Sequence, residues 1–150
     1  MVDVNLEEVE QDPEAIIESV RLAEVFVPNQ EELRRLTGRD SLEDAVATAV
    51  PWGSRLVVKL GADGALVADP DGVTQVKEGV RQVEVRDLTG AGDAFAGTMI
   101  GALLRGAALT EAVAQANAAG SAAASRLGAV GEVKVAGLSR TAAEAWEPGR

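Results

Sequence analysis

The stretch DLTGAGDAFAGTMIG, residues 87–101, decides the fold class of this 150-residue chain. Two of its glycines, Gly90 and Gly92, stand between an apolar segment that predicts a strand and an apolar run that predicts a helix. A strand, a glycine turn and a helix together aim free backbone N–H groups and the positive helix end at an anion. Asp93 places a carboxylate at the mouth of this loop, where it would repel phosphate but could accept a proton from a hydroxyl group. We therefore interpret residues 90–93 as an anion hole for a transferring phosphoryl group, with Asp93 facing the acceptor.

Two other interpretations of this loop stay open on spacing alone. An aspartate at a helix N-terminus is also a good cap, worth ~1 kcal/mol whatever the function. A Gly-x-Gly after a strand also begins the dinucleotide-binding fingerprint, and Glu111 lies roughly 20 residues further on. Phe95 stands where that fingerprint needs its third glycine, however, and no Gly-Lys-Ser/Thr of a Walker loop follows. Phosphate binding is favoured over a capped structural turn.

The composition excludes several classes of function. A net charge of −10 makes nucleic acid and anionic membranes unfavourable partners. The chain has no cysteine and no histidine, so disulfides, thiolate metal sites and Ser-His catalysis are excluded, and acid–base chemistry falls to Asp or Glu. No apolar run approaches the ~20 residues of a membrane span, and the N-terminal MVDVNLEEVEQD is too acidic for a signal peptide. We expect a soluble, cytoplasmic protein.

Alternating helix and strand patterns predict one α/β domain. Asp12 and Pro13 predict the cap and first turn of a helix, and glycines at 38 and 106 predict helix ends. Two alanine-rich helices follow the glycine loop, the first beginning at Asp93 and the second capped by Thr110. Strands are expected at 2–6, 25–27, 55–60, 65–68, 73–76 and 80–88, and helices at 12–24, 29–36, 41–50, 93–105, 110–127 and 141–146.

Four segments resemble, in order, the signatures of the ribokinase-like, or PfkB, carbohydrate kinases. DLTGAGDAFAG is similar to the family's D-T-x-G-A-G-D-x-F signature, and VPNQEEL (27–33) resembles its Asn-x-x-Glu motif. VVKLGADGALV (57–67) resembles the nucleotide-loop strand and turn, and ANAAGSAAASRLGA (116–129) resembles the late helix on the adenine side. The resemblance implies a ribokinase-like three-layer α/β/α sandwich that binds ATP and Mg²⁺.

The resemblance also implies roles for individual residues. Asp93 would be the catalytic base, with the anion hole formed by Gly90, Ala91 and Gly92. Asn29 would organise the magnesium-bound phosphates, with Glu32 binding Mg²⁺ through water, although Asn-x-x-Glu at a helix start is also a capping box. The nucleotide-binding set implied by the resemblance is Asn29, Lys59, Gly61, Ala62, Asp63, Gly64, Gly92 and Asn117.

Two parts of that nucleotide-binding set, the GADG segment and Asn117, have simpler interpretations. The GADG segment, residues 61–64, would form a hairpin turn without any nucleotide. Asn117 could equally be a polar residue tolerated on an alanine-rich helix. A monovalent-cation site for K⁺ is also implied by the resemblance, although Glu132 stands where relatives often have a small hydroxyl residue. Its members would be Asp87, Thr89, Ala123, Arg126 and Gly128.

The resemblance covers nearly the whole chain but only the C-terminal half of the family. Residues 1–150 are therefore expected to form a single domain that lacks the N-terminal sugar-binding and lid region. Asp3 and Asn5 match the family's Asp-x-Asn strand, whereas Glu7 replaces an arginine that faces the substrate in some members. A sheet without its first strands exposes an edge that should pair with a complementary N-terminal chain or a second copy.

We hypothesise ATP-dependent phosphorylation of a hydroxyl group on a small sugar or sugar acid. The alternative is a catalytically inactive nucleotide-binding or interaction remnant that needs a partner chain.

Overall fold

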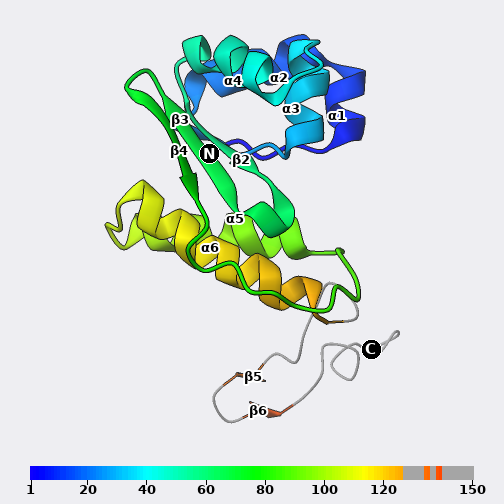
Figure 1. Cartoon of the computed structure of the whole chain (residues 1–150), viewed down its shortest axis with the longest axis vertical. Helices are drawn as coiled ribbons and strands as arrows, with labels where there is room; N and C mark the ends of the chain where they lie inside the picture. Colours follow the sequence, from blue (N-terminus) through cyan, green and yellow to red (C-terminus); the bar gives the residue numbers. More distant parts are fainter. Residues whose placement is uncertain (127–133, 136–137, 140–150) are drawn as a thin grey trace, which may run out of the picture.

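The computed structural model describes residues 1–126, 134–135 and 138–139, and these form three layers. Helices α1 to α4 cover one face of a mixed sheet, and α5 and α6 cover the other (Figure 1). The first group consists of α1 (Leu6–Gln11), α2 (Pro13–Leu22), α3 (Gln30–Thr37) and α4 (Leu42–Ala49), followed by the 3-10 turn η1 (Val50–Trp52). The second group consists of α5 (Ala91–Leu104) and α6 (Leu109–Ala124).

The main sheet of the described residues has four strands in the order β1-β2-β3-β4. Strands β1 and β2 are parallel, and β2, β3 and β4 form an antiparallel meander. Next to β1, Val2 forms an isolated parallel bridge with Phe26, so the N-terminal segment runs along the edge of the sheet. The bounds are β1 (Val25–Phe26), β2 (Arg55–Lys59), β3 (Ala65–Asp69) and β4 (Gly72–Val76), with a separate ribbon of β5 (Lys134–Val135) and β6 (Leu138–Ser139).

Side chains that alternate along the strands divide the core in two. Leu56 and Val58 of β2 pack among α1 to α4, whereas Val57 packs with Phe95 and Met99 of α5. Alternation of this kind follows from the two-residue period of a strand. Full burial of each such side chain stabilises the fold by about 1.5–3 kcal/mol, so both helical layers are held firmly to the strands that carry the loops.

Helices α5 and α6 lie against each other, as expected for the alanine-rich pair. Their small side chains allow a close approach near the glycine loop. A Cβ placed on Gly120 of α6 would lie 3.4 Å from the carbonyl oxygen of Ala91. The first turn of α5 therefore lies close to α6 at Gly120.

The prediction of a strand at residues 80–88 is wrong. This segment instead runs along α6, where the Arg81 N–H donates to Ser121 Oγ at 3.2 Å and the Arg86 N–H donates to the Ala124 carbonyl at 2.9 Å. Its apolar residues face a cleft rather than a sheet. Gly79, at φ 81°, packs against Ala114 and directs the chain from the sheet onto the helix.

Three helices or strands also begin or end at other residues than predicted. Helix α5 begins at Ala91 after Gly90, which adopts φ 78°, so Asp93 is its third residue rather than its first. Helix α6 has Ala108 rather than Thr110 at its N-cap. The strand predicted at 2–6 is reduced to the bridge at Val2, because Asn5 forms a capping box with Glu8 and starts α1.

The helix expected at 141–146 lies outside the described residues. None of the helices in the described part of the chain could span a lipid bilayer.

Candidate functional site

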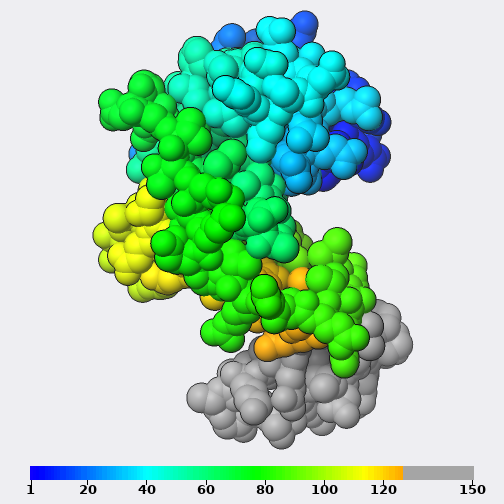
Figure 2. Space-filling view, in the orientation of Figure 1, coloured from blue at the N-terminus to red at the C-terminus, as the bar shows by residue number. Residues whose placement is uncertain are grey.

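A cleft of about 1050 Å³ lies where the carboxyl ends of the parallel strands face the start of α5. Figure 2 shows the molecule hollowed between the blue part of the surface, which contains α1, and the green part around the glycine loop. Open α/β sheets bind their ligands at such carboxyl ends. Most of the predicted site residues line this cleft, namely Asn29, Glu32, Lys59, Gly61, Ala62, Gly64, Ala91, Gly92, Asp93 and Asn117.

The glycine loop leaves the first turn of α5 uncapped. Gly90 is the N-cap residue, and no side chain accepts a hydrogen bond from the first turn; this is also true of α6, whereas α1 to α4 are capped by side chains. The N–H groups at the start of a helix have no intrahelical acceptor. Of the predicted anion hole, Gly90 does not line the cleft, and the Ala91 N–H already donates to the Leu88 carbonyl at 3.1 Å. The backbone N–H groups suited to an anion are therefore those of Gly92 and, beyond the predicted set, Asp93.

Asp93 is exposed on this first turn and lines the cleft. Because it makes no capping hydrogen bond, its carboxylate is free to accept a proton from a bound hydroxyl group. Phe95, which stands at the third-glycine position of the dinucleotide fingerprint, is instead buried in the core between the sheet and α6. This packing argues against the dinucleotide interpretation.

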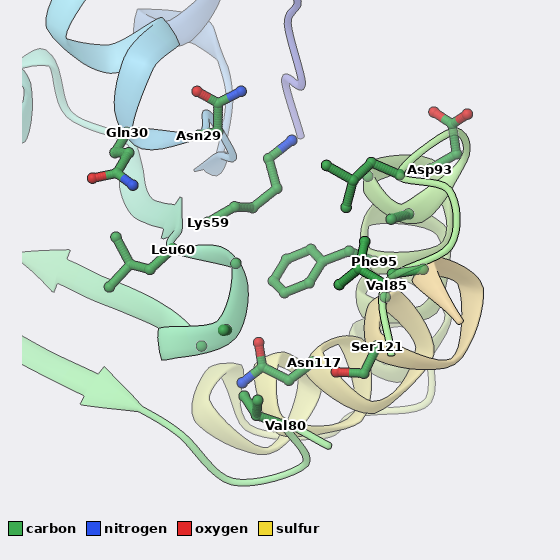
Figure 3. Close-up of a pocket in the computed structure, with 18 of the residues that line it drawn as sticks. Asn29, Gln30, Lys59, Leu60, Val80, Val85, Asp93, Phe95, Asn117 and Ser121 are labelled. Atoms are coloured by element: carbon green, nitrogen blue, oxygen red, sulfur yellow. The ribbon is translucent and has the colours of Figure 1, made fainter. Parts of the chain in front are cut away.

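Lys59 brings a cation to the glycine loop from the opposite side of the cleft. Its Nζ lies 2.7 Å from Asp3 Oδ1, and a Cβ placed on Gly92 would lie 3.9 Å from the same nitrogen. In Figure 3 the Lys59 side chain reaches from the end of β2 into the space between Asn29 and Asp93. The ammonium group therefore stands beside the proposed anion hole.

Asn29 and Glu32 form a complete capping box that also faces the cleft. Asn29 Oδ1 accepts from the Glu32 N–H at 2.9 Å, and the Asn29 N–H donates to Glu32 Oε2 at 2.6 Å. Glu32 is only 7% exposed, and its burial raises the pKa of the carboxyl above the usual 4.5, opposed by the Asn29 hydrogen bond and by Lys59. Capping explains the spacing of the pair, whereas the cost of burying a carboxylate beside a cleft indicates a further use for Glu32.

This raised pKa predicts how Glu32→Gln alters the pH dependence of stability. An acid with a higher pKa in the folded state contributes stability that is present at low pH and lost as pH rises above 4.5. Glutamine keeps an oxygen that can accept the Asn29 N–H but does not ionise. We therefore expect the variant to gain stability relative to the wild type as pH rises from 4.5 towards neutrality. Urea unfolding at a series of pH values measures this difference, and parallel profiles would contradict it.

The GADG segment forms the 3-10 turn η2 (Gly61–Asp63) followed by Gly64. The Leu60 N–H donates to the Gly64 carbonyl at 2.8 Å, so the turn closes without a ligand, as the simpler interpretation expects. A Cβ on Gly64 would lie 2.2 Å from the Val76 carbonyl oxygen, so only glycine fits here. The turn presents Gly61 and Ala62 to the cleft, whereas Asp63 pairs with Lys77 at 3.9 Å and does not line it.

Asn117 ties α6 to the chain that leaves β4. Its Nδ2 donates to the carbonyl oxygens of Val76 and Glu78, each at 3.0 Å, and the residue is 6% exposed. Asn117 therefore has a structural role that neither sequence interpretation included, in addition to its place in the cleft wall.

Replacing Asn117 by alanine is expected to lower the free energy of unfolding by about 1–3 kcal/mol, because the buried Val76 carbonyl and the partly buried contact to the Glu78 carbonyl lose their donor. Ser121→Ala, which removes a single hydrogen bond to the Arg81 N–H, should cost less than about 1 kcal/mol. Chemical denaturation of both variants measures the difference. Equal costs would show that the Asn117 hydrogen bonds do not hold this segment.

The residues expected to bind K⁺ are only partly brought together. Asp87 lies at the end of α6, where its N–H donates to the Ala124 carbonyl at 3.3 Å, and its Oδ1 accepts from the Thr89 N–H at 2.8 Å. The carbonyl of Ala123 accepts from the Arg126 N–H at 3.0 Å within the helix end. Gly128 lies outside the described residues, which contain no cluster of three or more His, Cys, Asp or Glu suited to a metal ion.

Sequence reasoning missed several cleft residues. Asp3 was noted as part of a motif, but nothing in the sequence pairs it with Lys59, 56 positions away. Arg34 also lines the cleft, where its Nη2 donates to Gln30 Oε1 at 3.3 Å. Segment 80–88 was expected in the sheet but supplies an apolar wall. Val80, Val83, Val85 and Leu88 make up this wall, and Leu60 and Phe95 also line the cleft (Figure 3).

Comparisons with known proteins agree with this geometry. The sequence profile of the pfkB family carbohydrate kinases matches residues 2–134. The chain is 35% identical over 141 residues to the aminoimidazole riboside kinase of Salmonella typhimurium, covering 87% of this chain and 44% of that protein. It is 36% identical over 97 residues to the cytidine kinase of Thermococcus kodakarensis, covering 64% of this chain and 35% of that protein.

Solved structures show the same fold. The crystal structure of the aminoimidazole riboside kinase from Salmonella enterica, complexed with aminoimidazole riboside and an ATP analogue, matches with a TM-score of 0.77 at 35% identity, covering 85% of this chain and 46% of that one. A Vibrio cholerae fructokinase double mutant bound to fructose, ADP and potassium matches with a TM-score of 0.75 at 35% identity, covering 85% of this chain and 44% of that one. The chain thus spans less than half the length of these relatives.

The α/β fold is therefore ribokinase-like, and the chain belongs to the pfkB family of carbohydrate kinases.

Proposed function

We propose that this chain forms the nucleotide-binding and catalytic part of a kinase that phosphorylates a hydroxyl group of a small sugar or sugar acid. One observation carries the proposal. In a single cleft, the uncapped first turn of α5 presents the exposed Asp93 carboxylate, and the Lys59 ammonium lies beside Gly92. A proton acceptor and an anion hole side by side are what phosphoryl transfer to a hydroxyl group requires.

The cleft residues fit Mg-ATP, which when bound would supply the transferred phosphoryl group and release ADP. The N–H groups of Gly92 and Asp93 would offset charge on the transferred group, and Lys59 would add a cation beside them. Glu32, buried at the cleft wall, would hold Mg²⁺ through water, oriented by the Asn29 N–H. Asp93 would accept the hydroxyl proton as the new P–O bond forms. The apolar wall of residues 80–88 would limit water in the site.

The acceptor class rests on the relatives, which are named as kinases of aminoimidazole riboside, cytidine and fructose. Each of these substrates contains a sugar with free hydroxyl groups. We propose that residues 1–150 are a single domain corresponding to the C-terminal half of such a kinase, acting in the cytoplasm. The acceptor site and a lid would then come from further polypeptide, in the same protein or in a complementary chain. We also propose that K⁺ binds near Asp87 and Thr89, and the support is that the Vibrio cholerae fructokinase structure contains a potassium ion.

A second candidate is a nucleotide-binding module without catalytic activity. The same cleft supports it, because Asn29, Lys59 and Asn117 line the cleft whether or not a hydroxyl group is phosphorylated there. Such a module would bind Mg-ATP and a partner chain or a second copy, but would not turn over ATP. Binding alone therefore does not separate the two candidates, whereas turnover does.

The test is a calorimetric titration of the purified chain with Mg-ATP and with Mg-ADP, at low and high KCl. We then measure ATP turnover with aminoimidazole riboside or fructose, with and without the N-terminal portion of the Salmonella kinase supplied in trans. Binding together with sugar-dependent turnover supports the kinase. Binding without turnover under either condition supports the inactive module, and a folded chain that binds neither nucleotide contradicts both.

A further inference from the structure

We propose that Asp3 is a positioning residue that holds the Lys59 ammonium beside the Gly90–Gly92 loop. The inference rests on the proposed function, because it assigns Asp3 a part in binding the transferred phosphoryl group. Asp3 would touch neither the nucleotide nor the acceptor, and would act only through Lys59.

The topology brings the two residues to one edge of the sheet. The Val2 N–H donates to the Val25 carbonyl and the Val27 N–H donates to the Val2 carbonyl, each at 2.9 Å, so the N-terminal segment runs parallel to β1. On the other side of β1, Asn29 forms a parallel bridge with Lys59. The three extended segments that end at residues 3, 29 and 59 therefore meet at the carboxyl edge of the sheet, which faces α5. Asp3 extends from the outermost of these segments into the cleft.

Burial distinguishes the Asp3–Lys59 ion pair from the other ion pairs in the described part of the chain. Its side chains are 27% and 17% exposed at a separation of 2.7 Å. The Glu10–Arg35 pair, by contrast, has side chains about 60% exposed at 3.5 Å. Exposed pairs contribute about 0–1 kcal/mol because water and salt screen them. A shorter charge-assisted contact between less exposed side chains orients its partners more strongly, so Asp3 can fix where the Lys59 ammonium points.

A second carboxylate, that of Glu32, also attracts the Lys59 ammonium, so a separate residue is needed to keep the ammonium at the loop. Glu32 is close enough to Lys59 for the ammonium to lower the pKa of its carboxyl, while Asp3 acts in the opposite direction. Without Asp3, the flexible lysine side chain would turn towards Glu32 and leave Gly92. Asp3 therefore keeps the cation at the loop and keeps Glu32 free for hydrated Mg²⁺.

The experiment compares Asp3→Asn, Asp3→Glu and Lys59→Met by calorimetric titration with Mg-ATP and Mg-ADP. Under the proposed function the loop receives a phosphoryl group that ADP lacks. Asp3→Asn is therefore expected to weaken Mg-ATP binding about tenfold, the equivalent of one charge-assisted hydrogen bond, and to change Mg-ADP binding by less than about twofold. Asp3→Glu should restore most of the affinity. In the Lys59→Met background, Asp3→Asn should have no further effect, which is the signature of a coupled pair.

A matched control removes an acid from an ion pair outside the cleft. Glu10→Gln breaks the exposed contact with Arg35 and should leave both affinities unchanged. If Asp3→Asn leaves Mg-ATP binding unchanged, strengthens it, or weakens both nucleotides equally with a lower melting temperature, the positioning role is overturned.

A nucleotide-free measurement separates this inference from the proposed function. In ¹⁵N spectra of the chain alone, Asp3→Asn should shift the Gly92 amide resonance and abolish a protected Lys59 ammonium signal. If the wild type binds neither nucleotide, the proposed function fails, and these spectra still decide whether Asp3 holds the ammonium at the loop. An unshifted Gly92 resonance would overturn the inference even where nucleotide binds.

Discussion

Asp93→Asn is expected to lower sugar-dependent ATP turnover by about 10²- to 10⁴-fold, the usual contribution of a general base. Asparagine has nearly the same shape but does not accept a proton at neutral pH. Asp93 is exposed and makes no capping hydrogen bond, so its replacement should leave the fold intact. Mg-ATP binding should stay within about threefold of the wild type, because backbone N–H groups and Lys59 rather than Asp93 would contact the phosphates. Single-turnover kinetics with the complemented chain and calorimetry measure the two quantities.

Glu111→Gln provides the matched control. Glu111 is the third residue of α6, as Asp93 is the third residue of α5, and both are exposed. Both substitutions therefore remove the same charge from the same position in a helix dipole, a change worth about 0.3–1 kcal/mol. Only Asp93 lines the cleft. If the two variants lose turnover equally, or if Asp93→Asn keeps full turnover, Asp93 is not the base.

The contrast between these two acids shows how far the sequence could predict the site. The motif spacing around Gly90, Asn29 and Lys59 predicted which residues line one cleft, because the carboxyl ends of parallel strands and the helix starts that follow them meet at one edge. The sequence did not distinguish a capping aspartate from a free one, because that depends on where the helix begins. Helix α5 begins two residues earlier than predicted, so Asp93 lies within its first turn and does not cap it.

In the fold, too, the elements with local sequence signals were predicted and those that depend on distant contacts were not. Strand β2 and the β3–β4 meander were predicted closely, since period-two burial and glycine turns are local signals. The prediction of a strand at residues 80–88 was wrong, because partly alternating valines give the same local pattern whether they face a sheet or a cleft. Contacts with α6 decide between these, namely the packing of Gly79 and the hydrogen bonds of Arg81 and Arg86, and each joins positions far apart in the sequence. The Asp3–Lys59 pair was missed for the same reason.

Gly79→Ala is therefore expected to have the largest effect on stability of any single-methyl change proposed here. Gly79 adopts φ 81°, and a Cβ there would lie 1.9 Å from the Ala114 carbonyl oxygen and 2.9 Å from its carbonyl carbon. Both neighbours are backbone atoms of a packed helix and cannot rotate away. A left-handed conformation costs an L-residue roughly 1–2 kcal/mol, and forced overpacking adds about 1–3 kcal/mol. We expect the free energy of unfolding to fall by about 3 kcal/mol or more, which is a large part of the 5–15 kcal/mol typical of a domain.

Gly106→Ala isolates the steric part of this effect. Gly106 has nearly the same conformation, at φ 86°, but a Cβ there would meet nothing within 4 Å. It should therefore cost only the conformational term, about 1–2 kcal/mol. Urea unfolding gives both values, and Mg-ATP titration of the folded fraction adds a second readout, because displacing residue 79 also displaces the apolar wall of the cleft. Equal destabilisation by the two variants would show that segment 80–88 does not cross α6 at Ala114. If Gly79→Ala alone loses both stability and nucleotide affinity, the glycine that diverts this segment from the sheet also builds the site.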